Sequence, residues 1–283
     1  MSLTAWTWDP AVLLGIAVAG GLYARGWRHL KRRSTSRAVL FASGLGLVLL
    51  ALCSPIGTYD QDLFSLHMVE HLLLTIGAPP LLLLGKPLLP WLWGLPQQER
   101  RGVAKLIGPT SLAAQLGTLL ADPKVALTLY VSTFAFWHVP TLYDAAQGQS
   151  LVHYLEHLTF FVTAIFFWWP VIHPTGGTRS LSKVASIGYF SVPMFESTLI
   201  GALLTFANRA FYATYAQAPR LSSLSAVDDQ QLAGLIMWIP GGLVYVAAIL
   251  GLLASVLREE DELADADLRR AQVPEDRRNL VLD

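Results

Sequence analysis

The sequence predicts an all-α membrane protein, a polytopic bundle of about seven transmembrane helices. Of its 283 residues, 53% are hydrophobic and only 14% are charged, whereas a soluble domain carries about 25% charged residues. The apolar residues also form runs close to the roughly 20 residues that a helix needs to cross a bilayer. The formal net charge of +0 argues against a nucleic-acid-binding protein, and a single cysteine excludes an internal disulfide.

The predicted spans follow one another along the chain, and the first and fourth are the shortest. They lie at residues 10–24, 38–54, 66–85, 125–139, 151–172, 184–206 and 232–257. The first run leaves open an uncleaved signal anchor, although the residues before it lack the basic charge of a secretory signal. Pro79 and Pro80 predict a kink or a widened turn in the third span. We therefore expect a transmembrane domain at residues 1–257 and a polar tail at residues 258–283, a frayed helix followed by disorder.

Basic residues set the predicted orientation. All but two of the 20 lysines and arginines fall in the connections after the first, third and fifth spans or in the tail, and the exceptions are Arg209 and Arg220. The positive-inside rule then places the amino terminus outside and the carboxyl terminus in the cytoplasm. On the outer side, residues 207–231 hold Tyr212 and Tyr215, and we expect a partly structured cap there.

The pattern H-x-x-E-H occurs twice, at the outer start of the third span (residues 67–71) and of the fifth (residues 153–157). The two histidines of each pattern share a helix face about 6 Å apart, a spacing that suits chelation of one ion. Each glutamate either binds the ion or accepts the second ring N–H of a histidine. Facing helices of a bundle build metal sites in this way. The predicted metal ligands are His67, Glu70, His71, His138, His153, Glu156 and His157.

Five further residues have two interpretations each. Imidazole suits copper, zinc, iron and nickel, and Cys53, Met68 and Met237 are soft ligands at a similar depth, although such residues more often fill space in a core. Asp229 either caps the seventh span or joins the site. Glu196, near the middle of the sixth span, either relays protons or a cation or is a neutral, hydrogen-bonded acid.

The histidine patterns stand among further motifs along the chain. These are Ala-Pro-Pro-Leu-Leu-Leu-Leu-Gly at 78–85, Trp-His-Val-Pro at 137–140, Leu-Tyr-Asp-Ala at 142–145, Phe-Trp-Trp-Pro at 167–170 and the run at 229–238. Together they resemble the multi-spanning CtaG family of cytochrome c oxidase assembly factors. The resemblance implies a multi-pass protein of the bacterial inner membrane that helps mature a haem–copper oxidase through copper handling. It also implies an oxidase subunit, a periplasmic copper donor and membrane lipid as partners.

Three functions compete at this stage. The first is an assembly factor that binds copper at the outward-facing histidines, helps metallate the oxidase and has no catalytic residue. The second is an intramembrane zinc-dependent hydrolase, in which histidines hold a zinc-bound water and a glutamate acts as general base; H-x-x-E-H is also the inverzincin pattern. The third is a membrane cytochrome with haem between facing histidines. Copper is the expected metal and zinc the alternative.

Overall fold

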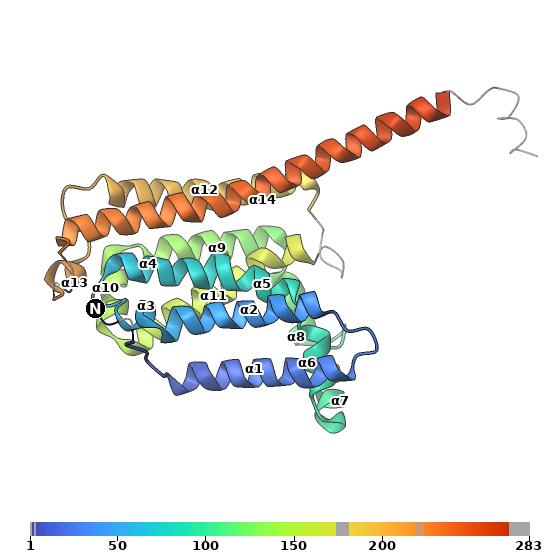
Figure 1. Ribbon diagram of the computed structural model, residues 1–283, viewed down its shortest axis with the longest axis horizontal. Coiled ribbons are helices and arrows are strands. Elements are labelled where there is room, and N and C mark those ends of the chain that lie inside the picture. Colours follow the sequence, from blue (N-terminus) through green and yellow to red (C-terminus); the bar gives the residue numbers. More distant parts are fainter. Residues whose placement is uncertain (1, 3, 174–180, 220, 222, 272–283) are drawn as a thin grey trace, which may run out of the picture.

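The helices of the chain lie side by side in one bundle (Figure 1). The structure is a computed structural model that describes residues 2, 4–173, 181–219, 221 and 223–271, and it contains no strand within these ranges. Arg179, Arg220 and residues 272–283, which entered the orientation and tail predictions, lie outside the described residues.

Among the described residues, six helical segments are long and apolar enough to cross a membrane. They are α1 (Pro10–His29), α2 (Thr35–Cys53), the segment Phe64–Leu84, α11 (Ser150–Ile172), α12 (Lys183–Thr205) and α14 (Ala226–Ala271). A bent pair, α8 (Leu112–Leu120) and α9 (Pro123–Trp137), makes up to seven. The prediction of about seven transmembrane helices is confirmed.

The fourth predicted span, residues 125–139, corresponds to α9, which has the same length of 15 residues. Helix α9 meets α8 at an angle of 70°, a bend that the sequence did not predict. The break has a local cause, because Asp122 caps α9 by accepting a hydrogen bond from the backbone N–H of Lys124, and Pro123 occupies the first helical position. The described part of the tail is helical, since α14 runs on without a break to Ala271 through residues that favour helix.

Short helices close the two ends of the bundle. Helices α3 (Pro55–Thr58), α10 (Pro140–Gly148) and α13 (Ala213–Gln217) gather near the amino terminus, at the left of Figure 1. Helices α6 (Leu88–Gly94) and α7 (Gln97–Leu106) lie with α8 at the opposite end. The region of the expected cap is partly structured, because it contains α13, with buried Tyr215 inside the helix and buried Tyr212 directly before it.

Helices α12 and α14 run alongside each other (Figure 1). Gly201 and Gly234 meet where they cross, and a Cβ atom added to Gly234 would lie 2.6 Å from the carbonyl oxygen of Gly201. Only glycine allows so close a helix–helix approach. This contact fixes α14, whose first turn reaches the candidate site.

Candidate metal centre

Helix α4 (Phe64–Leu72), which carries the first histidine pattern, is capped by a residue far away in the sequence. The side chain of Asp229, in the first turn of α14, accepts hydrogen bonds from the backbone N–H groups of Phe64 (2.7 Å) and Ser65 (3.2 Å). Asp228 instead bonds Ser225 at the start of α14. Asp229 therefore stabilises a different helix from the one that the sequence suggested.

Directly after the histidines, the third span widens into a π-helix, η1 (Leu73–Gly77), which continues as α5 (Ala78–Leu84). Pro79 lacks the N–H that would bond the carbonyl of Thr75 in an α-helix. The indole N–H of Trp168 donates to that carbonyl instead, at 3.0 Å. The widened turn expected from Pro79 and Pro80 is confirmed, and it fixes the span below His71.

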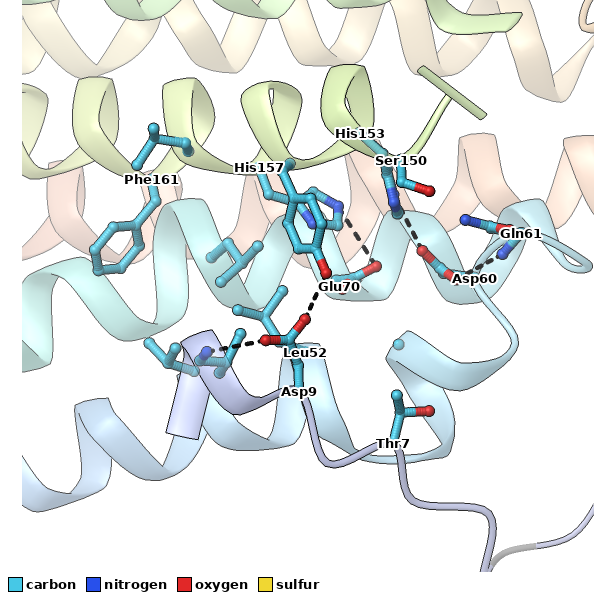
Figure 2. A pocket seen from close by; sticks show the side chains of 16 residues that line it. Thr7, Asp9, Leu52, Asp60, Gln61, Glu70, Ser150, His153, His157 and Phe161 are labelled. Atoms are coloured by element: carbon cyan, nitrogen blue, oxygen red, sulfur yellow. Dashed lines mark hydrogen bonds and ion pairs between the residues drawn. The ribbon is translucent and has the colours of Figure 1, made fainter. Parts of the chain in front are cut away.

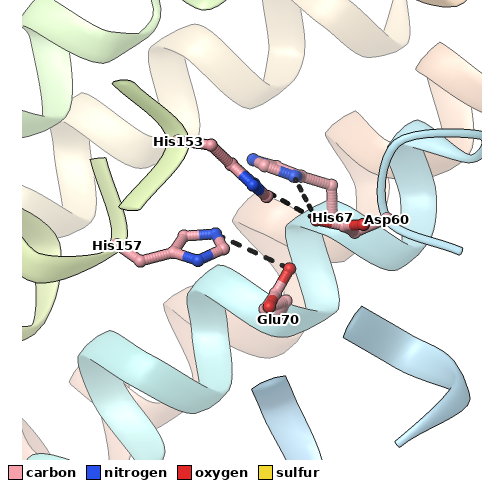
Figure 3. A group of neighbouring side chains, drawn as sticks. All are labelled: Asp60, His67, Glu70, His153 and His157. Atoms are coloured by element: carbon pink, nitrogen blue, oxygen red, sulfur yellow. Dashed lines mark ion pairs between the residues drawn. The ribbon is translucent and has the colours of Figure 1, made fainter. Parts of the chain in front are cut away.

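Helices α4 and α11 bring the two histidine patterns together (Figure 3). The ring centroids of His67 and His71 are 4.0 Å apart, and those of His153 and His157 are 4.2 Å apart. Across the helices, the rings of His67 and His153 are 5.5 Å apart. Four of the five predicted histidines thus form one cluster.

Each glutamate faces the histidines of the other helix. Glu70 Oε2 lies 3.6 Å from His157 Nε2. Glu156 Oε1 lies 3.8 Å from His67 Nε2 and 3.7 Å from His71 Nε2. The two patterns therefore complete one another, and neither helix holds a full set of ligands alone.

The structure adds two residues that sequence reasoning missed. Asp60 Oδ2, in the connection before α4, lies 3.1 Å from His153 Nε2 and 3.8 Å from His67 Nδ1. Gln147 Nε2 of α10 lies 3.2 Å from the same His67 Nδ1. The only signal for Asp60 was its place just before the first pattern on the predicted outer side, which it shares with Asp62.

Asp60 lies outside the membrane-spanning segments and carries a charge into the cluster. Burial raises the pKa of Asp60, but the attraction of the nearby His153 and His67 rings outweighs burial and holds the pKa well below its usual range. Asp60 is therefore an anionic oxygen donor at neutral pH.

Many polar atoms of the cluster are buried and have no hydrogen-bond partner in the described part of the chain. They are His67 Nε2, Glu70 Oε2, both ring nitrogens of His71, His153 Nε2, both carboxylate oxygens of Glu156 and His157 Nε2. Each such atom costs about 1–3 kcal/mol if nothing pairs with it. A cation bound among these atoms would satisfy them, so the donor set fits a metal.

Two overlapping groups have ligand atoms within 4.8 Å of one another. The first is Asp60, His67, Glu70, His153 and His157, and the second is His67, His71, Glu156 and His157. Within the described ranges, neither group includes His138, Cys53 or Glu196. The Nδ1 atom of His138 is 2.7 Å from the carbonyl oxygen of Phe134. Met68 and Met237 pack in an aromatic cluster.

A pocket of about 380 Å³ leads to the cluster (Figure 2). Its lining includes Asp60, Glu70 and His153, and at its edge the hydroxyl of Tyr154 donates to Asp9 Oδ2 at 2.5 Å. The side chain of His153 is 14% exposed, whereas that of His67 is 0% exposed. The pocket therefore reaches the cluster from the side of α11.

These features define a helical, multi-pass membrane protein with a buried histidine–carboxylate cluster near one end of its bundle. A family model described as cytochrome c oxidase caa3 assembly factor (Caa3_CtaG) matches residues 21–259. The chain belongs to this family of bacterial membrane proteins, as the motifs of the sequence indicated.

The relatives found among curated proteins are longer than this chain. Uncharacterized proteins of Mycobacterium bovis and Mycobacterium tuberculosis are each 29% identical over 278 residues, and one of Mycobacterium leprae is 26% identical over 279 residues. Each alignment covers 95% of this chain but only 42% of the relative. No solved structure is significantly similar to the chain.

Proposed function

We propose that this protein binds copper at the histidine–carboxylate cluster and helps metallate a haem–copper oxidase subunit. The observation that carries the proposal is the meeting of four histidines with Asp60, Glu70 and Glu156 in one buried cluster whose donor atoms lack partners. Such a cluster is costly without a cation. Because the chain belongs to an oxidase assembly family, we infer that the oxidase receives the bound ion.

The donor set favours copper in its divalent state. Imidazole and carboxylate ligands suit Cu²⁺ or Zn²⁺, and Cu²⁺ binds more tightly at a given site of this kind. Cu⁺ prefers thiolate and thioether sulfur; in the described part of the chain both groups lack Cys53, and Met68 and Met237 pack in the aromatic cluster.

The number of protein ligands supports transfer of an ion in preference to hydrolysis. A catalytic zinc ion has three protein ligands and an open position for water. The two groups here offer five and four ligands. If every member of a group binds, the ion has no position left for a reacting water, which supports binding of an ion in preference to hydrolysis.

The predicted orientation places the cluster at the outer face. Copper would then arrive from a periplasmic donor through the pocket beside His153 and leave toward the oxidase subunit. The transmembrane domain, residues 1–257, would hold the site among lipids, and residues 258–283 would face the cytoplasm.

A double variant tests the proposal. We expect the parent protein, purified in mild detergent and loaded with copper, to retain stoichiometric metal, and His71→Ala with His157→Ala to lose nearly all of it. The exposed His29 offers a control, since His29→Ala should keep the parent metal content. Elemental analysis measures the metal, and circular dichroism with gel filtration verifies folding.

Undiminished copper in a folded double variant would contradict the proposal. Zinc held in place of copper, with water bound to it, would favour the hydrolase. An absorbance spectrum on the same sample tests for haem, because a Soret band would favour the cytochrome.

A further inference from the structure

We infer that the cluster holds two ions at once, an outer and an inner one, bridged by the imidazole of His67. This inference rests on the proposed function for the identity of the metal. It rests on the geometry of the cluster for the number of ions.

The two sets of ligands have members that they do not share. Asp60 and His153 belong only to the outer set and approach each other to 3.1 Å. His71 and Glu156 belong only to the inner set and approach each other to 3.7 Å. Each set therefore has an imidazole and a carboxylate of its own.

His67 stands between the sets and presents one ring nitrogen to each. Its Nδ1 lies 3.8 Å from Asp60 Oδ2, and its Nε2 lies 3.8 Å from Glu156 Oε1. The two nitrogen lone pairs of an imidazole point away from each other, so one ring cannot give both to a single ion. An ion beside Asp60 and an ion beside Glu156 are therefore separate ions that share this ring.

The buried carboxylates of the cluster are divided between the two sets. Asp60, Glu70 and Glu156 are all buried; Asp60 and Glu70 belong to the outer set and Glu156 to the inner set. A buried carboxylate is stabilised when it is paired or binds a metal, so each position has a carboxylate that a cation would satisfy. When both ions bind, His67 releases its ring proton to solvent, because only the deprotonated ring offers a lone pair on each nitrogen.

The two positions differ in their access to solvent. The pocket is lined by Asp60, Glu70 and His153, which belong only to the outer set, and by His157, which belongs to both sets. Among the inner ligands, Glu156 has a side-chain exposure of 0% and His71 of 8%. The outer ion therefore exchanges readily, whereas the inner ion is retained and holds α4 and α11 together.

A matched pair of substitutions tests the inference. His153→Ala removes a ligand of the outer set only, and His71→Ala one of the inner set only. We expect the parent protein to bind about two Cu²⁺ per chain and each variant about one. The ion left in His153→Ala should be lost slowly to a chelator and the ion left in His71→Ala quickly. His138→Ala, outside both sets, should keep both ions.

Electron paramagnetic resonance of the copper-loaded parent protein gives a second reading that needs no variant. Two Cu²⁺ ions bridged by one imidazole couple, so the signal should account for much less copper than elemental analysis finds. One copper per chain with a full signal would overturn the two-ion inference and leave the proposed function standing. Loss of both ions in each single variant would also overturn the inference. A parent protein without copper would overturn both proposals.

Discussion

The same pattern, H-x-x-E-H, occupies two different settings in this molecule. On α4 it is enclosed, because Asp229 caps the helix start, the π-helix follows and the side chain of His67 is 0% exposed. On α11 it lies at the edge of the bundle, where the helix start has no side-chain cap and His153 borders the pocket. The surroundings of α4 hold His67 in place, whereas the start of α11 borders the pocket through which an ion could enter.

The difference shows that a ligand pattern does not fix the role of its residues. Spacing within a helix brings two imidazoles onto one face in both copies. What surrounds that face decides whether an ion is retained or exchanged. We therefore assign positioning of the cluster to α4, and access for an ion to His153 at the start of α11.

The largest predicted effect follows from removing the distant cap of the α4 half. Asp229→Ala leaves two buried backbone N–H groups without an acceptor, and we expect the free energy of unfolding to fall by about 2 kcal/mol. Thermal unfolding of the metal-free protein in detergent measures it. Asp228→Ala, at an exposed neighbouring position, should have a much smaller effect. Equal effects of the two variants would mean that α4 is not fixed by α14.

A smaller effect is predicted below the histidines. Trp168→Phe removes the donor to the carbonyl of Thr75, which Pro79 cannot bond. We expect a loss of about 1 kcal/mol and faster hydrogen exchange in the third span. Trp169→Phe provides a neighbouring control. An unchanged exchange rate in Trp168→Phe would show that the π-helix needs no such support.

The smallest predicted effect is at the edge of the pocket. Tyr154→Phe removes the hydrogen bond to Asp9, and because Asp9 is largely exposed we expect a change below about 0.5 kcal/mol. That hydrogen bond lowers the pKa of Asp9 from 3.8, so its contribution is complete above that value and is lost as the pH falls through the lowered pKa.

The difference between Tyr154→Phe and the parent protein should therefore be constant between about pH 5 and 8. Copper uptake should be as fast or faster in the variant, because the bond lies at the pocket edge. Stopped-flow measurement of copper binding tests this, and slower uptake would place the ion's route elsewhere.

Much of the fold could be predicted from the sequence because the bilayer imposes span length and composition. The spans near residues 151–172 and 184–206 match α11 and α12 closely. The span near residues 125–139 matches α9, but its bend against α8 was not predicted, because the bend before Pro123 depends on a local cap and a proline in an apolar stretch. Hydropathy averages over such a break.

The candidate site was predictable where helix periodicity sets it and unpredictable where tertiary contacts do. The four clustered histidines follow from spacing and depth alone. Asp60 lies in a loop without periodicity, and the role of Asp229 at α4 depends on how α12 and α14 pack. Glu70 of α4 lies near His157 of α11, and Glu156 of α11 lies near His71 of α4. These contacts depend on how α4 and α11 are rotated relative to each other, which the sequence pattern does not encode.

The cap on α4 has a consequence for biogenesis. Asp229 follows Phe64 by 165 residues, so the ribosome delivers it long after α4 has left the exit tunnel. The start of α4 gains its acceptors only when α14 inserts beside α12. A nascent chain halted before that point would carry all four histidines of the cluster, but His67 and His71 would lie on a helix without its cap. Under the proposed function, tight binding of copper would then be reserved for chains whose insertion is finished.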